Sequence, residues 1–147
     1  MGDDSQRVTG GCLCGDIRYE ADQPPYEVGY CHCRICQKAL GNLFGPSVFF
    51  KLAHFRFISE KPVWYKSSDL VQRGFCGRCG SPIAYQRIDA DFLVIWIGTL
   101  DQPEAYEPRI HWWSDSKIPW VDIHSSLPDG TADLPSYQVA KQATAET

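Results

Sequence analysis

Seven cysteines in three short clusters constrain this chain more than any other feature of its sequence. The clusters occupy residues 12–14, 31–36 and 76–79, and no cysteine lies outside them. In a reducing compartment, clustered thiols bind metal ions or carry out chemistry more often than they form disulfides. Metal binding is therefore the leading interpretation. The alternative is that several of these cysteines are buried apolar side chains or disulfide partners.

The spacing within each cluster suits a tetrahedral metal ion. The first cluster is a Cys-x-Cys pair, Cys12 and Cys14, and residues i and i+2 of an extended segment point to the same side. The last is a Cys-x-x-Cys pair, Cys76 and Cys79, whose tight turn is eased by neighbouring glycines. The middle cluster combines both spacings in Cys31, Cys33 and Cys36. These spacings predict zinc sites.

Clusters of two, three and two cysteines divide most simply into a site of four and a site of three. The site of four would join the first and last pairs, and the middle cluster would form the site of three. Spacing alone does not require this division. Cys33 and Cys36 can equally complete a four-sulfur site with either distant pair and leave Cys31 free.

The rest of the sequence favours a single, mainly β domain. A chain of 147 residues can bury a core without disulfides, and its prolines and glycines leave few windows with helical spacing. One helical turn is expected over Ile35–Leu40, ended by Gly41. The predicted strands, paired as antiparallel hairpins, are Asp16–Ala21, Glu27–Cys31, Ser47–Lys51, Phe55–Ile58, Val63–Lys66, Val71–Cys76, Ile83–Arg87 and Phe92–Ile97.

Charge and hydropathy exclude some classes of partner. The net charge of −4 leaves no broad basic stripe for phosphates, so nucleic acid is a disfavoured partner. The first ten residues lack the basic start and apolar stretch of a secretory signal. The longest apolar run, Phe92–Ile97, is far shorter than the roughly 20 residues that cross a bilayer. We expect a cytoplasmic protein with no membrane partner, and nothing in the sequence indicates a particular oligomeric state.

Three sequence runs resemble those of glutathione-dependent formaldehyde-activating enzymes and the related centromere protein V. They are GGCLCGDIRY at residues 10–19, CHCRICQK at 31–38 and RGFCGRCGSP at 73–82. The similarity covers about residues 7–120 and includes GTLD at 98–101. It implies a twisted antiparallel β fold of the tent type with two zinc ions.

The resemblance also implies a role for each cysteine cluster. The first and last pairs would hold a structural zinc ion through Cys12, Cys14, Cys76 and Cys79. The middle cluster would hold the catalytic zinc ion through Cys31, Cys33 and Cys36. The zinc domain would span residues 7–124, after a flexible start at 1–6 and before a C-terminal extension at 125–147 that is partly disordered.

A zinc ion with three thiolate ligands favours thiol chemistry over hydrolysis. Three protein ligands leave a position for water or substrate, whereas four saturate the ion. Three thiolates give Zn(II) a formal charge of −1, so a bound water loses its proton less readily than at a neutral three-histidine centre. An incoming thiol can instead be held as the nucleophilic thiolate. We therefore expect a carbon–sulfur lyase that acts on the adduct of a thiol, such as glutathione, with a small aldehyde such as formaldehyde.

Each residue beside the middle cluster is compatible with two roles. Arg34 and Lys38 could offset the negative charge or meet a substrate carboxylate, or they could be solvent-facing charges. His32 should point away from the face that carries the neighbouring cysteines, which favours a structural role. His111 and the two tryptophans after it could form a wall of the site or part of the core. The turn at residues 37–41 could offer backbone N–H groups to a developing oxygen charge.

Two other functional classes compete with the enzyme. A zinc-stabilised binding module without turnover would share the cysteine pattern, but such proteins are expected to add basic or low-complexity extensions, which this chain lacks. A redox protein with a Cys-x-x-Cys motif would place that motif at a helix N-terminus beside a βαβ unit, and no such pattern is present.

Overall fold

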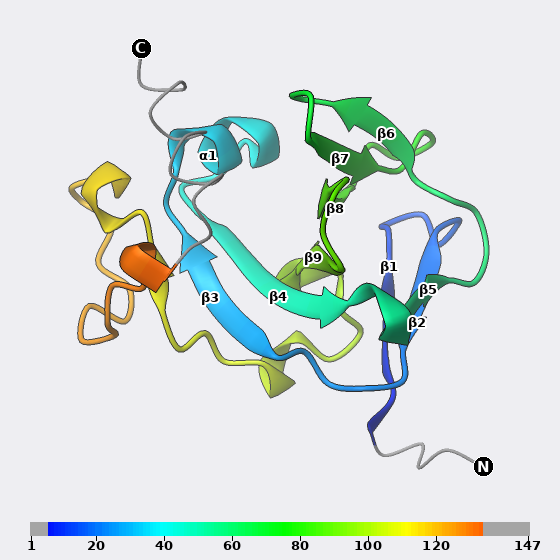
Figure 1. Ribbon diagram of the computed structural model, residues 1–147, viewed down its shortest axis with the longest axis horizontal. Coiled ribbons are helices and arrows are strands. Elements are labelled where there is room, and N and C mark those ends of the chain that lie inside the picture. Colours follow the sequence, from blue (N-terminus) through cyan, green and yellow to red (C-terminus); the bar gives the residue numbers. More distant parts are fainter. Residues whose placement is uncertain (1–5, 134–147) are drawn as a thin grey trace. The chain divides into compact units, whose positions relative to one another are not determined.

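The computed structural model describes residues 6–133 and divides into two compact units (Figure 1). The first unit comprises Met1–Glu27 and Val48–Glu107, and the second comprises Val28–Ser47 and Pro108–Thr147. Residues 1–5 of the expected flexible start and residues 134–147 of the expected extension lie outside the described part. Within the described part, no helix is both long and apolar enough to cross a membrane.

A small antiparallel sheet in the first unit forms around Tyr19. Its strands are β1 (Val8–Gly11), β2 (Arg18–Ala21) and β5 (Phe55–Phe57), in the order β1-β2-β5. Burial alternates along β1 and β2, so each strand turns every second side chain into the core. Tyr19 is fully buried there and stacks on Phe55, with ring centroids 5.2 Å apart.

Four further strands of the first unit form consecutive antiparallel pairs. They are β6 (Val63–Lys66), β7 (Val71–Phe75), β8 (Pro82–Arg87) and β9 (Phe92–Trp96). All five residues of β9 are buried, which explains its continuous apolar run. The register of β7 against β8 shifts between Gly74 and Phe75. This irregularity directly precedes Cys76, so the strand pairing ends where the cysteine turn begins.

The second unit carries the only α-helix of the described residues. Strand β3 (Glu27–Cys31) leads into α1 (Arg34–Leu40), and the chain then enters β4 (Gly45–Lys51) (Figure 1). Cys33 caps the start of α1, and Gly41 ends it in the left-handed region with a φ of 61°. The two-residue strand β10 (His111–Trp112) runs parallel to β3.

Short 3-10 turns complete the secondary structure. In the first unit they are Leu52–His54, Ile97–Thr99 and Pro103–Ala105, and in the second they are Ser114–Ser116 and Thr131–Asp133.

The mainly β fold expected from the sequence is confirmed, with two differences. Each of the eight predicted strands is present within two residues of its expected bounds, and so is the helix that ends at Gly41. Strand β1 was not predicted, because the glycines in Val8–Gly11 argue against a strand. Gly10 is needed there: a Cβ at this position would lie 2.3 Å from the Tyr19 hydroxyl and 2.4 Å from the Thr99 carbonyl.

The second difference concerns strand direction. Strand β10 was not among the predicted strands, and it pairs in parallel with β3 through His111 opposite Tyr30 and Trp112 opposite Cys31. Parallel partners need a long connection, and here the segment between residues 31 and 111 provides it. Spacing within short windows of sequence does not reveal such a pair.

Candidate metal centres

Four cysteine sulfurs meet in the first unit. Cys12 and Cys14 lie in the turn after β1, and Cys76 and Cys79 lie in the turn between β7 and β8. All four Sγ atoms lie within 4.8 Å of one another. The Sγ atoms of Cys12 and Cys14 are 3.5 Å apart, and those of Cys14 and Cys76 are 3.7 Å apart. A tetrahedron with Zn–S distances of about 2.3 Å has S···S edges of about 3.8 Å, so the four sulfurs fit such an ion.

The backbone of both turns directs N–H groups at the sulfurs. The Ile17 N–H donates to Cys12 Sγ at 3.2 Å, and the N–H groups of Arg78 and Cys79 each donate to Cys76 Sγ at 3.4 Å. Gly80 ends the second turn with a φ of 77°, a conformation that glycine adopts without strain. These donors stabilise thiolate sulfur, the form that binds a metal.

Side chains also join the two turns to each other. The Ser81 hydroxyl accepts a hydrogen bond from the Leu13 N–H at 3.1 Å and lies 3.1 Å from Cys79 Sγ. Arg78 forms an ion pair with Asp16 at 3.0 Å. The cluster thus closes two segments that are distant in the sequence, as a structural site would.

The four thiols cannot all be ionised without a cation between them. Hydrogen bonds from the Ser81 side chain and backbone lower the pKa of Cys79 to about 5. A backbone hydrogen bond from Asp16 lowers the pKa of Cys14, but desolvation and the sulfurs of Cys12 and Cys76 outweigh it and raise that pKa to about 12. A metal ion would relieve this repulsion and release the remaining protons.

The other three sulfurs meet at the end of β3 in the second unit. Cys31 is the last residue of β3, Cys33 caps α1, and Cys36 lies in the first turn of that helix. Their Sγ atoms all lie within 4.8 Å of one another. The Cys36 N–H donates to Cys33 Sγ at 3.2 Å. The structure therefore groups the seven cysteines as four and three, with Cys33 and Cys36 beside Cys31 rather than beside a distant pair.

In this three-sulfur cluster Cys33 and Cys36 are buried and Cys31 is half-buried, and the cluster favours protonated thiols when no cation is present. The sulfurs of Cys33 and Cys36, together with burial, raise the pKa of Cys31 well above its usual value. A hydrogen bond from Cys31 lowers the pKa of Cys33, but Cys36 and burial outweigh it and raise that pKa to about 12. Sulfur donors alone suit a soft or borderline metal, zinc among them, so the donor set fits the ion that the sequence predicts.

Among the described residues, no fourth His, Cys, Asp or Glu side chain joins the three sulfurs as a ligand. His32 lies between two of them in sequence, but its ring is directed elsewhere: its Nε2 lies 2.7 Å from His111 Nδ1. The ring is fully buried, and burial lowers the pKa of His32 to about 4. A metal ion held by this cluster would keep one coordination position for another ligand.

Three further residues of α1, two of them singled out in the sequence for their charge, differ in their exposure. Arg34 and Lys38 are exposed on α1, and Arg34 donates to Gln37 Oε1. Gln37, considered from the sequence only for the backbone N–H groups of its turn, is 3% exposed. Its Nε2 donates to the carbonyl of His32 at 2.8 Å and to that of Ser116 at 3.2 Å. The sequence offered no means of finding these partners, because Ser116 lies 79 residues away.

The segment at His111 lies partly in the core, with Trp113 half-buried. His111 and Trp112 are buried. Trp113 adopts the left-handed conformation with a φ of 60°. His54, in the first unit, places its Nδ1 2.8 Å from Asp22 Oδ1.

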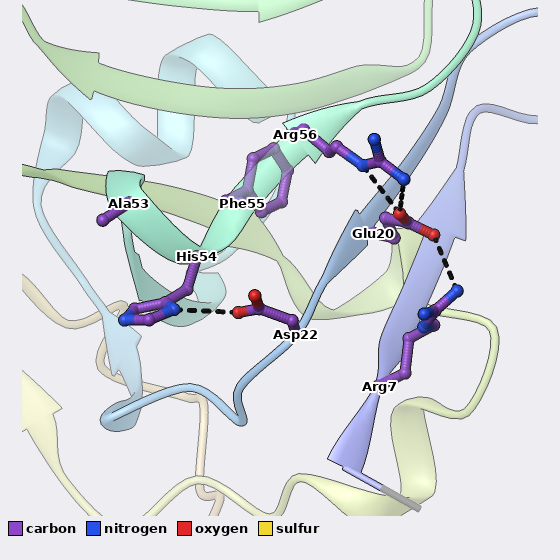
Figure 2. Close-up of a pocket in the computed structure, with 7 residues that line it drawn as sticks. All are labelled: Arg7, Glu20, Asp22, Ala53, His54, Phe55 and Arg56. Atoms are coloured by element: carbon purple, nitrogen blue, oxygen red, sulfur yellow. Dashed lines mark hydrogen bonds and ion pairs between the residues drawn. The ribbon is translucent and has the colours of Figure 1, made fainter. Parts of the chain in front are cut away.

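A separate pocket lies over the β1-β2-β5 sheet of the first unit, with a volume of about 410 Å³. Figure 2 shows that its charged side chains pair with each other: Arg7 and Arg56 with Glu20, and His54 with Asp22. None of the seven cysteines lines it.

The fold and the two sulfur clusters define a class: a mainly β protein with one four-cysteine and one three-cysteine candidate metal centre. The sequence pattern of the glutathione-dependent formaldehyde-activating enzymes matches residues 7–116, and this chain belongs to that family. The expected resemblance is thereby confirmed. No curated protein matches the chain.

A crystal structure of a Rhodobacter sphaeroides protein has a similar fold. It is 16% identical in sequence to this chain and superposes with a TM-score of 0.51. The match covers 82% of this chain and 98% of the other. At this identity the similarity supports the fold alone.

Proposed function

We propose that this protein is a zinc-dependent carbon–sulfur lyase that acts on the adduct of a small thiol with a small aldehyde. The thiol is glutathione or a close analogue, and the aldehyde is formaldehyde in the family's description. In the synthetic direction the thiol loses its proton, a bond forms between sulfur and the aldehyde carbon, and the carbonyl oxygen takes up a proton. The lyase direction reverses each step. We place the reaction in the cytoplasm, where reducing conditions keep all seven thiols available.

One observation carries this proposal: in the described part of the chain, the sulfurs of half-buried Cys31 and buried Cys33 and Cys36 gather without a fourth protein ligand, and a complete four-sulfur cluster forms elsewhere in the sequence. The complete cluster suits a structural ion, and the incomplete one suits an ion that accepts a substrate. We therefore assign Cys12, Cys14, Cys76 and Cys79 to a structural zinc ion, and Cys31, Cys33 and Cys36 to a catalytic one. Bound zinc would supply a Lewis acid that stabilises thiolate sulfur or polarises a carbonyl oxygen.

The surrounding residues prepare the cluster for that role. The Cys36 N–H stabilises negative charge on Cys33, and the helix cap holds both sulfurs at the start of α1. Arg34 and Lys38 lie exposed on the same short helix, where their charges can attract an anionic thiol substrate. Glutathione carries two carboxylates, so this charge would assist its approach more than that of formaldehyde.

Metal content tests the assignment of the two sites. The wild-type protein should contain two zinc ions per chain, and a variant with Cys31→Ser, Cys33→Ser and Cys36→Ser should contain one and remain folded. Elemental analysis gives the count, and circular dichroism reports folding. A triple variant that loses both ions, or that unfolds completely, would contradict the assignment.

Turnover tests the reaction itself. Thiols and formaldehyde combine spontaneously, so the measurement should be the exchange rate between ¹³C-formaldehyde and its glutathione adduct, followed by magnetisation-transfer NMR with and without enzyme. We expect exchange to accelerate with the wild-type protein and to return to the spontaneous rate with the triple variant. His54→Asn, at a site away from the cysteines, provides a matched control that should behave as wild type. Absence of acceleration with any thiol and aldehyde pair would favour a binding module.

A further inference from the structure

We propose that residues 124–131, here called the C-terminal arm, act as a positioning element for the three-cysteine centre and do so through His111 and His32. The arm lies beyond residue 116, where the family match ends. The proposal rests on the metal-binding role proposed above for Cys31, Cys33 and Cys36. All the contacts that support it lie within the second unit.

The first step is that His32 is held at three points from outside its own loop. Its N–H donates to the Trp112 carbonyl at 2.9 Å, and its carbonyl accepts from Gln37 Nε2 at 2.8 Å. Its imidazole Nε2 lies 2.7 Å from His111 Nδ1. Because His32 is the single residue between Cys31 and Cys33, fixing it also fixes the directions of the two sulfurs on either side.

The second step is that His111 joins His32 to the arm. His111 Nε2 donates to the carbonyl of His124 at 2.8 Å, so in neutral rings its Nδ1 accepts from His32 Nε2–H. The His111 backbone is bonded to the arm as well: its N–H donates to the Pro128 carbonyl at 3.0 Å, and its carbonyl accepts from the Gly130 N–H at 2.7 Å. His111 thus transmits the position of the arm to the cysteine loop.

The third step is that the arm is seated closely and in one conformation. A Cβ at Gly130 would lie 2.1 Å from Ile110 Cδ1 and 2.6 Å from Ile110 Cγ1, so any side chain there forces Ile110 or the arm to move. His124 adopts a φ of 43°, an uncommon conformation for a residue with a side chain. The Thr131 hydroxyl accepts from the Trp113 N–H at 2.6 Å. These contacts hold the His124 carbonyl toward His111 and restrict the conformations open to the arm.

The consequence concerns metal affinity. Residues that hold metal ligands in place are worth about 10- to 100-fold in affinity when they are replaced. We expect displacement of the arm to weaken zinc binding at the three-cysteine centre by a factor in that range. The four-cysteine centre lies in the other unit and should keep its affinity.

The test uses Gly130→Ala, whose added methyl group collides with Ile110. Zinc affinities come from competition with a chromogenic chelator, and the Cys31→Ser, Cys33→Ser, Cys36→Ser variant supplies the signal of the four-cysteine centre alone. We expect the zinc affinity of the three-cysteine centre to be about 10- to 100-fold lower in G130A than in the wild type. Cobalt(II) bound at that centre should also show altered d–d bands, which report ligand geometry rather than fold stability.

Two further variants make the test specific. Ile110→Ala removes both carbons that collide with the new methyl group, so the double variant G130A/I110A should recover most of the lost affinity. Gly98→Ala is the matched control, because a Cβ there meets nothing within 4 Å and the backbone needs no glycine. It should leave both affinities and the cobalt spectrum unchanged.

Substitutions at His111 keep the proposal falsifiable if G130A does not fold. His111→Asn retains an acceptor for His32 but loses the donor to the arm, whereas His111→Phe loses both. We expect a larger loss of affinity at the three-cysteine centre for H111F than for H111N. If G130A and H111F fold and bind zinc with wild-type affinity, the role of the arm is overturned but the proposed function is not. An equal loss of zinc affinity at both centres would have the same meaning. A wild-type protein that binds only one ion would overturn the proposed function and this inference together.

Discussion

Removing the four-cysteine centre should destabilise the protein far more than removing the three-cysteine centre. The perturbation is a pair of variants: Cys76→Ser with Cys79→Ser, and Cys31→Ser with Cys33→Ser and Cys36→Ser. Serine is close to cysteine in size, so neither variant leaves a large cavity. The two differ chiefly in how much chain each cluster constrains.

The expected magnitude follows from the length of chain that each cluster closes. Cys14 and Cys76 lie 62 residues apart, and a cross-link over that distance restricts the unfolded chain by about 4 kcal/mol. The loop from Cys31 to Cys36 is much shorter, and the same relation gives about 2 kcal/mol. A domain is typically stable by only about 5–15 kcal/mol, so the first loss removes a large fraction of the whole.

Urea denaturation followed by circular dichroism measures the difference. With a slope of about 2 kcal/mol per molar urea, the first variant should lower the unfolding midpoint by about 2 M and the second by about 1 M. Zinc content should be measured on the same samples, so that the wild-type reference is known to carry both ions. Equal midpoint shifts, or a larger shift for the three-cysteine variant, would refute this reasoning.

Three other predictions concern single residues. Tyr19→Phe keeps the buried ring but removes its 2.7 Å hydrogen bond to Thr99, so the free energy of unfolding in urea should fall by about 1 kcal/mol; an unchanged value would mean that the bond contributes nothing. Gly41→Ala places a side chain at a φ of 61° and should lower the thermal midpoint by the equivalent of about 1 kcal/mol, whereas a stabilised variant would contradict the left-handed cap. A hydrogen bond from Arg18 lowers the pKa of Asp101 in the folded state, so its contribution is present above the unfolded pKa of about 3.9 and is lost as pH falls through the folded value. Asp101→Asn should therefore make the loss of stability at acid pH smaller by less than about 1 kcal/mol, the size expected for a half-exposed ion pair. A variant that loses more stability than the wild type as pH falls would contradict the lowered pKa of Asp101.

Features set by neighbouring residues could be predicted well. The strand β9 follows from one apolar run, and the end of α1 follows from Gly41, because each depends on side chains within a few positions. The cysteine spacings indicated metal binding for the same reason. Strand β1 was missed because its Gly10 is required by Tyr19 and Thr99, whose atoms lie close to it only after folding.

The sequence by itself determined that this is a mainly β protein whose thiols are arranged for metal binding, since residue spacing and strand periodicity are local properties. Only the tertiary structure decided how the seven sulfurs divide into four and three, because spacing allowed other groupings. It also decided that His32 points to His111 and that residues 124–131 support this pair. His32 and His111 lie 79 positions apart in the sequence, and their contact forms only when strand pairing and close packing bring the two segments together.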